Sequence, residues 1–266
     1  MMKRVQLLKT EMIRGFMYRF DVFLGLLYPA IRFFVQFSFW TYIYNTNNNA
    51  DVLFGFDRRT MVSYFFIGYI ITLFNKSDAM TLGNEIKDGK IDRDLLKPIN
   101  YIWYRFMRNI GNKIFPVMLL IPFIVFFSLV FPNYVFFNVS VNSMILFFLF
   151  LLMGFIINFF IDFIIGTTAF VFDDVWAISA SINHIKRFVA GEFLPLSILP
   201  NILTMWLSYL PFQYIIYYPA LILVKQINRY ELTKNLLIGV LWTFLLYIIT
   251  IFVWRKMIRK FSAFGG

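Results

Sequence analysis

Residues 114–161 read IFPVMLLIPFIVFFSLVFPNYVFFNVSVNSMILFFLFLLMGFIINFFI and contain no charged side chain. A bilayer core about 30 Å thick needs about 20 mainly apolar residues for each helical crossing. The turn-forming pair Pro132-Asn133 divides the stretch into two runs of about that length, residues 114–131 and 141–161. The stretch therefore predicts two membrane-spanning helices, and the rest of the chain repeats the pattern.

The composition indicates a membrane protein rather than a soluble one. Of the 266 residues, 60% are hydrophobic, 21% aromatic and 15% charged, and the mean hydropathy is +0.71. The chain has no cysteine and a single histidine, His184, which argues against thiolate metal sites, iron–sulfur clusters and multi-histidine metal centres. The net charge of +11 fits contact with cytoplasmic membrane edges and anionic headgroups better than nucleic-acid binding.

Four further apolar segments complete the pattern. They cover residues 22–44, 60–74, 164–189 and 236–254, of which the third is the least apolar. Together with the two runs above, they predict an all-α integral membrane protein with six transmembrane helices, in a single domain that covers residues 1–266.

The first segment, residues 1–20, has a mixed character. Val5, Leu8, Met12 and Phe16 recur three and four positions apart, among five basic residues. This spacing predicts an N-terminal amphipathic helix that lies in the membrane interface. A cleaved signal peptide is the alternative, but the apolar run that follows lacks a small-residue cleavage site at its end, so we expect an uncleaved first crossing.

A segment punctuated by prolines precedes the last crossing. Residues 191–224 contain Pro195, Pro200, Pro211 and Pro219. Each proline lacks a backbone donor and interrupts a straight helix, so short helices that dip into one leaflet are the simpler arrangement. We expect a re-entrant segment on the extracellular side.

The basic residues predict the orientation. Seventeen of the 25 lysines and arginines lie in three segments, residues 1–20, 75–113 and 255–260. Seven lie in other polar segments, and Arg32 lies inside the first crossing. Because lysine and arginine are enriched in cytoplasmic loops, the three segments rich in them are expected to face the cytoplasm. Both termini would then be cytoplasmic, in a protein of the bacterial cell membrane.

The largest polar segment, residues 75–113, is expected to contain a short amphipathic helix. Asp88 or Gly89 can start this helix and Pro98 can end it. Its apolar side chains, expected on a single face, are Ile91, Leu95 and Leu96. Such a stripe could dock onto a cytoplasmic partner or simply pack on the membrane surface.

Charged residues within the apolar runs are candidates for function, since ionised groups at membrane depth are costly and usually have a role. Asp162, Asp173 and Asp174 could act as proton carriers or catalytic carboxylates, although the latter two could lie at an interface. Arg32 needs a partner or a wet cavity, and Asp162 is a candidate by charge alone. His184 is expected at an interface rather than acting as a general base.

Motifs for nucleotide binding or catalysis are not found. Residues 83–91 superficially resemble a phosphate-binding loop, but five residues separate the glycines instead of four, and Ile91 replaces the magnesium-binding hydroxyl. No nucleophile elbow or zinc-protease motif occurs either. We therefore expect no catalytic residue, bound metal or cofactor in this chain, and any ATP hydrolysis would belong to another subunit.

Two motifs resemble those of ABC-2 type ATP-binding-cassette permeases, and the resemblance covers essentially the whole chain. The first motif resembles the signature after the second crossing and comprises Glu85, Gly89, Ile91, Leu95, Leu96 and Pro98. The second resembles the pattern of one subfamily and comprises Gly191, Pro195, Leu196, Pro200, Leu210, Pro211, Phe212 and Pro219. The basic, glycine-terminated tail, residues 259–266, is similar to that subfamily too. The acidic pair Asp173-Asp174 departs from its pattern.

The resemblance implies a half-transporter. Two such permeases, identical or different, would pair and sit on two cytoplasmic ATPase subunits that bind ATP and Mg²⁺. The helix in residues 75–113 would be the coupling helix that conveys ATPase closure to the crossings. Export of an amphipathic or lipid-like substrate is the expected activity, with membrane lipids as further partners.

Two rival functions remain open from the sequence. A membrane-bound enzyme that modifies lipids could use Asp162, Asp173 or Asp174, and turnover without any ATPase would identify it. A proton-coupled secondary transporter could use the same residues, and transport driven by a pH gradient without ATP would identify that.

Overall fold

A computed structural model describes residues 19–46, 52–76, 78–132, 140–172, 175–225 and 227–260. About 82% of it is helical. The helices are α2 (Arg19–Thr46), α3 (Arg58–Phe74), α4 (Ala79–Lys87), α5 (Ile91–Leu95), α6 (Tyr101–Val130), α7 (Val141–Thr167), α8 (Val175–Val189), α9 (Asn201–Ser208), α10 (Tyr217–Val224) and α11 (Arg229–Met257). Short 3₁₀ turns cover Thr168–Phe170, Leu196–Ile198, Pro211–Tyr214 and Ile258–Lys260. This helix content fits the predicted all-α membrane protein.

Within these described ranges, three helices are long and apolar enough to cross a bilayer. They cover Tyr101–Leu129, Val141–Phe170 and Arg229–Met257, with mean hydropathies of 2.0, 2.8 and 2.6. The helix α2 has 28 residues and α3 has 17, and each matches an expected crossing closely at both ends.

The expected fifth crossing, residues 164–189, is not one helix. Its first residues continue α7 to Thr167, a 3₁₀ turn follows, and α8 starts only at Val175. At 1.5 Å per residue, the 15 residues of α8 extend about 22 Å, less than a bilayer core. The acidic pair at 173–174, which made this segment unusual, lies outside the described residues.

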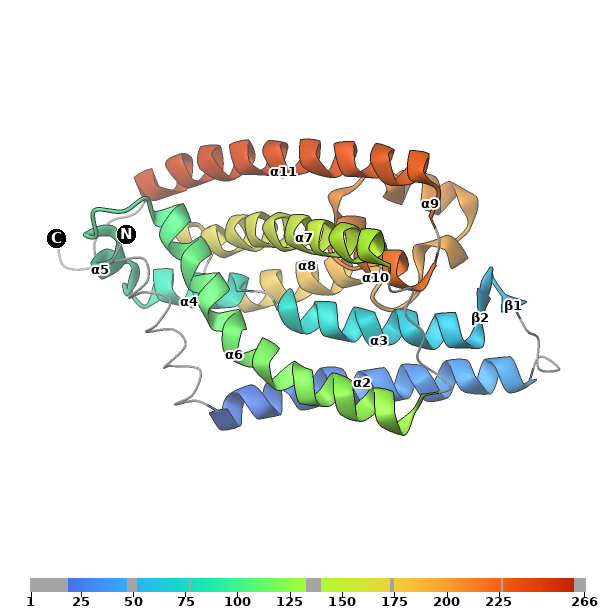
Figure 1. Cartoon of the computed structure of the whole chain (residues 1–266). Helices are drawn as coiled ribbons and strands as arrows, with labels where there is room; N and C mark the ends of the chain where they lie inside the picture. The colour runs from blue at the N-terminus through green and yellow to red at the C-terminus, as the bar shows by residue number, and fades with distance from the viewer. Residues whose placement is uncertain are drawn as a thin grey trace.

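The third crossing starts earlier than the hydropathy indicates. The Asn100 side chain caps α6 by accepting hydrogen bonds from the backbone N–H groups of Ile102 and Trp103. The basic side chains within residues 101–113 therefore belong to this helix rather than to a loop. Figure 1 shows α6 passing from α4 and α7 at one end to α2 at the other. There the Phe127 ring lies 4.5 Å from the Phe66 ring of α3 and 5.0 Å from that of Phe33 of α2.

A small hairpin joins α2 to α3. Strands β1 (Val52–Leu53) and β2 (Phe56–Asp57) pair antiparallel. The Asp57 side chain then accepts the backbone N–H of Thr60 at 3.4 Å, which caps α3. Residues 1–18 of the interfacial helix predicted for 1–20, the asparagines at 47–49 and the tail from 261 lie outside the described part.

Helix α7 forms the centre of the molecule, between α11 and α10, with α4 at one end (Figure 1). Glycines permit the closest approaches. A Cβ at Gly154 would lie 2.3 Å from the carbonyl oxygen of Tyr214, and one at Gly166 would lie 2.8 Å from Leu82 of α4. The chain therefore fixes the 3₁₀ turn at 211–214 and helix α4 against α7 through backbone proximity.

The prolines of residues 191–224 fall where short helices begin. Pro195 and Pro200 precede the 3₁₀ turn at 196–198 and α9, and Pro211 opens the next turn. Pro219 lies in the first turn of α10, where no helical hydrogen bond is lost. Residues 191–224 thus form short helices and turns rather than one straight helix, and every residue of α10 from Tyr218 to Val224 is buried.

Candidate functional site

The first candidate site is the corner formed by α4 and α5. Gly89 joins the two helices with a φ of 67°, in the left-handed region that glycine adopts without steric cost. Helix α5 begins at Ile91, two or three residues after the expected start, and ends at Leu95, three residues before Pro98. The corner is thus a tight reversal rather than one amphipathic helix.

The apolar stripe expected on α5 is divided between two directions. Ile91 is 1% exposed and Leu95 is half-buried, whereas Leu96 is 85% exposed. Residues 91 and 95 are one helical turn apart and both face the protein, while residue 96 is rotated by about 100°. The expectation of a single outward face is therefore wrong, because the core takes up its first two members.

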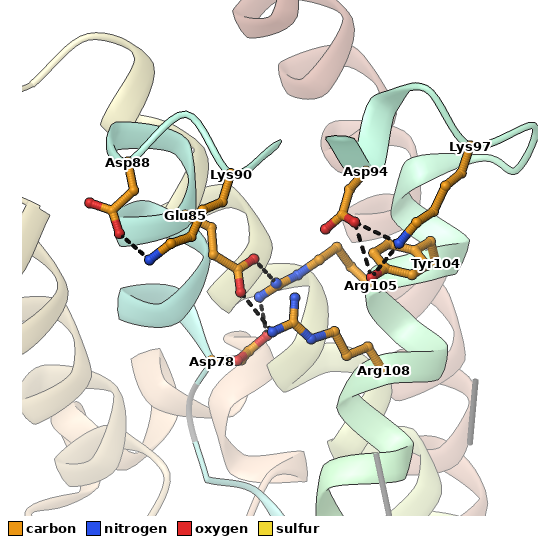
Figure 2. A network of polar contacts seen from close by, with 9 residues as sticks. All are labelled: Asp78, Glu85, Asp88, Lys90, Asp94, Lys97, Tyr104, Arg105 and Arg108. Carbon is orange, nitrogen blue, oxygen red and sulfur yellow. Dashed lines mark hydrogen bonds and ion pairs between the residues drawn. The ribbon is translucent and has the colours of Figure 1, made fainter. Parts of the chain in front are cut away.

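A buried arginine ties this corner to α6. Arg105 is only 1% exposed and pairs with Asp78, which directly precedes α4, and with Glu85 of α4 at 2.5 Å. Arg108 lies 2.7 Å from the other carboxylate oxygen of Glu85. Figure 2 shows both guanidinium groups converging from α6 on these two acids. Glu85, expected on the docking surface, instead binds α4 to α6.

A second cluster closes the α5 side of the corner (Figure 2). The Lys97 ammonium donates to Asp94 Oδ1 at 2.6 Å and to the Tyr104 hydroxyl at 3.0 Å, and that hydroxyl donates to Asp94 at 3.3 Å. Although partial burial acts in the opposite direction, the hydrogen bonds to Asp94 and Tyr104 raise the pKa of Lys97 above its ordinary value. Lys97 therefore stays charged at physiological pH and holds the exit of α5 to α6.

Asp162 of α7 contacts Asp78, which precedes α4, and pairs with Lys186. The Lys186 ammonium of α8 donates to Asp162 Oδ1 at 2.5 Å. The other oxygen, Oδ2, accepts Asn158 Nδ2 at 3.1 Å and the backbone N–H of Asp78 at 3.3 Å. Asp162 thus links α7, α8 and the start of α4. The candidate pairing of Arg32 with Asp162 is wrong.

Arg32 instead pairs with Glu192, which the sequence reasoning did not single out. Arg187 Nε donates to Glu192 Oε2 at 2.5 Å, and Arg187 Nη2 donates to Oε1 at 2.8 Å. The Thr72 hydroxyl also donates to Oε1, at 3.2 Å. A signal was present in the sequence, since Glu192 is the only acidic residue between Asp174 and Glu231.

The end of α8 explains why Glu192 points back to Arg187. Gly191 has a φ of 84°, its N–H donates to the Phe188 carbonyl, and the Glu192 N–H donates to the Arg187 carbonyl, each at 3.1 Å. These two bonds form a Schellman motif, in which glycine supplies the left-handed residue. The Tyr64 hydroxyl further fixes the turn by donating to the Gly191 carbonyl at 2.6 Å. This motif glycine thus positions a buried acid.

The remaining candidates lie apart from these clusters. His184 is exposed on α8. Pro211 is buried and Phe212 half-buried at the turn that packs on Gly154. In the described ranges, no group of three or more His, Cys, Asp or Glu residues could hold a metal ion.

Comparison with known proteins covers nearly the whole chain. A family model described as "ABC-2 family transporter protein" matches residues 30–265, which include both the α4–α5 corner and the Gly191 turn. A search of curated proteins found no match.

Proposed function

Since the chain belongs to the ABC-2 transporter family, we propose that it is the permease subunit of an ATP-driven exporter and that the α4–α5 corner receives a separate ATPase. In this proposal two permeases pair in the cell membrane and two cytoplasmic ATPases bind ATP and Mg²⁺. The permease itself carries no catalytic residue.

The exposed side chain of Leu96 is the observation that carries the docking proposal. In the sequence it follows three charged residues that are also exposed, Lys87, Lys90 and Arg93. Exposure of a leucine side chain to water is unfavourable. The same side chain can insert as an anchor into an apolar pocket of a partner whose rim is polar. Ile99 and Trp103, which follow in the sequence, are exposed too.

The clusters around Arg105 and Asp162 suit this corner to transmit force. Arg105 and Arg108 join α4 to α6, and Asp162 joins the start of α4 to α7 and α8. A push on Leu96 would therefore reach α6, α7 and α8 through charged contacts, which resist separation because a buried charge without a partner is costly. These contacts support the proposal that the corner moves together with the helices it joins.

Six crossings with cytoplasmic termini form part of the proposal. They would be α2, α3, α6, α7 and α11, with a fifth crossing that α8 begins and that the re-entrant segment with α9 and α10 completes, because α8 alone is shorter than a bilayer core. The α4–α5 corner and the basic end of α11 lie at the same end of the molecule (Figure 1), and the ring of Tyr101 stacks on that of Trp254 at 4.6 Å. Lys186 and Arg187 are bound inside the protein, so they no longer oppose this orientation.

An apolar groove supports an amphipathic or lipid-like cargo. It has a volume of about 710 Å³ and lies between α7 and α11, where Met153, Leu236 and Phe244 are among its lining residues. Asp162, one of the three aspartates that the rival enzyme and proton-carrier functions could use, is bound to Lys186.

The docking proposal is tested with a Leu96→Asp variant, co-expressed with the candidate ATPase subunits from neighbouring reading frames. Burial of one leucine contributes about 1.5 to 3 kcal/mol, so its loss should weaken docking by about ten- to a hundredfold. We expect normal insertion but loss of co-purified ATPase and of transport. Tyr230→Asp is the matched control, because Tyr230 is 77% exposed at the opposite end, in the first turn of α11.

Two outcomes would count against the proposal. If the Leu96→Asp variant retains the ATPase at wild-type yield, Leu96 is not the anchor. If Tyr230→Asp loses the ATPase equally, the effect reflects general damage to the permease.

A further inference from the structure

A hollow lies between the first turns of α6 and the second halves of α7 and α11, at the end of the molecule where α5 lies (Figure 1). It has a volume of about 430 Å³. Its lining residues, nearly all apolar or aromatic, include Trp103, Phe106, Ile156, Phe160, Tyr247 and Ile251. Each of the three helices is long and apolar enough to cross a bilayer, so the hollow lies at the level of lipid.

The last turns of α11 show which part of the bilayer the hollow occupies. The apolar run of α11 ends at Trp254, whose ring stacks on that of Tyr101, and Arg255 follows directly. Half of a bilayer core is about 15 Å thick, which is the length of about ten helical residues. Ile251 and Tyr247, which line the hollow, lie four and eight residues before Arg255. The hollow therefore fits within one leaflet and lies close to the headgroups.

Positive charge lies at the polar edge of this hollow. Residues 247, 251 and 255 follow one another at one helical turn, so Arg255 continues the face of α11 that lines the hollow. Arg255, Lys256 and Arg259 are all exposed. In the part of the chain that the structure describes, Arg255 has no ion pair, and its guanidinium can reach a headgroup.

The nearby acids are engaged with other cations. Asp78 and Glu85 pair with Arg105, and Asp94 pairs with Lys97 (Figure 2). The acid of α11 itself is in its first turn, at the opposite end of the helix. The basic end of α11 is therefore suited to an anion from outside the chain.

We propose that the hollow holds an acyl chain of an anionic phospholipid of the cytoplasmic leaflet, and that the phosphate of this lipid binds Arg255. A guanidinium donates two parallel hydrogen bonds to a phosphate, and the apolar wall needs no polar partner from the chain. An uncharged lipid would fill the hollow equally well, so the charge at Arg255 supplies the selectivity. The choice of leaflet rests on the proposed function, because it uses the orientation proposed there.

The test measures lipid retention by the purified full-length permease in an uncharged detergent, using native mass spectrometry. Phosphatidylglycerol and phosphatidylcholine are supplied at equal concentration, and the ratio of the two retained lipids is compared. We expect the wild type to prefer phosphatidylglycerol. Arg255→Gln should lower this preference about fivefold, the contribution of one basic residue near an anionic lipid surface. Arg255→Lys, which keeps the charge but not the two-point geometry, should retain part of it.

Arg229→Gln is the matched control, since it removes one exposed positive charge from the opposite end of α11. It should keep the preference of the wild type. Arg255→Gln should fold, because Arg255 is exposed, and equal melting temperatures of this variant and the wild type without added lipid would verify this. Glycerol phosphate, which carries the anionic group without acyl chains, should not displace phosphatidylglycerol from the wild type.

Four results would overturn the proposal. Equal retention of the two lipids by the wild type would remove the selectivity, and an unchanged preference of Arg255→Gln would remove the role of Arg255. Displacement of phosphatidylglycerol by glycerol phosphate would assign Arg255 to a soluble anion. A dimer that retains neither lipid would assign the hollow to contact with a second copy of the chain. None of these measurements uses the ATPase, so failure of the docking test at Leu96 is distinguishable from failure here.

Discussion

Replacing Arg105 by glutamine tests whether the corner of α4 and α5 is held by charge. The variant keeps much of the side-chain volume but removes the cation that faces Asp78 and Glu85. Glu85 keeps Arg108 at 2.7 Å, so Asp78 is the acid that loses its cation. Its side chain is only 20% exposed, so solvent compensates for little of this loss.

The expected loss follows from these contacts. Removing one member of a buried ion pair costs about 3 to 5 kcal/mol, and the lower end applies because Glu85 remains paired. A loss of about 3 kcal/mol lowers the melting temperature of a chain of this size by about 6 to 12 °C. Thermal unfolding of the purified permease in detergent measures this shift directly.

Two further variants separate charge from volume. Arg105→Gln combined with Asp78→Asn should recover part of the loss, because no carboxylate is then left without a cation. Arg93→Gln is the matched control, since Arg93 is exposed on α5 at the same end of the molecule. A melting temperature of Arg105→Gln equal to that of Arg93→Gln would refute the reasoning.

Two other predictions concern the packing of α7. Lys186→Met leaves Asp162 buried without its cation and should destabilise the permease by about 3 kcal/mol or more. Adding Asp162→Asn should restore much of this stability. Equal melting temperatures of the single and double variants would contradict the pairing. Gly154→Ala should lower the melting temperature, because its Cβ would lie 2.3 Å from a backbone oxygen, while the control Gly68→Ala meets only Ile216, at 3.7 Å, and should be neutral or stabilising. Similar behaviour of the two alanine variants would show that the close approach at Gly154 is relaxed at no cost.

Hydropathy and proline placement predicted much of the fold. The apolar runs at 22–44, 60–74 and 141–161 correspond to α2, α3 and most of α7, because such runs can be recognised without knowledge of the residues that pack against them. The start of α6 was missed for the opposite reason. Arg105 and Arg108 look like loop residues until acids from α4 are placed beside them.

The candidate sites depended still more on long-range contacts. The exposed position of Leu96 and the buried one of Ile91 follow from how α5 meets the core, which a short periodic pattern cannot specify. Pairing Arg32 with Asp162 relied on charge alone, and the fold gave each a partner from the region of α8. Gly191 was noted for its motif, but its backbone conformation revealed what it positions.

The Arg32–Glu192 pair also constrains the order in which the protein can be completed during synthesis. Arg32 leaves the ribosome 160 residues before Glu192, given their positions in the chain. At about 5 to 20 residues per second, this interval lasts about 8 to 32 s. An arginine at the centre of a membrane helix costs about 2.5 to 3.5 kcal/mol to insert. Arg32 of the nascent α2 therefore has no Glu192 to pair with while most of the other helices are synthesised. The Arg32–Glu192 ion pair can form only after the chain has been synthesised past the end of α8.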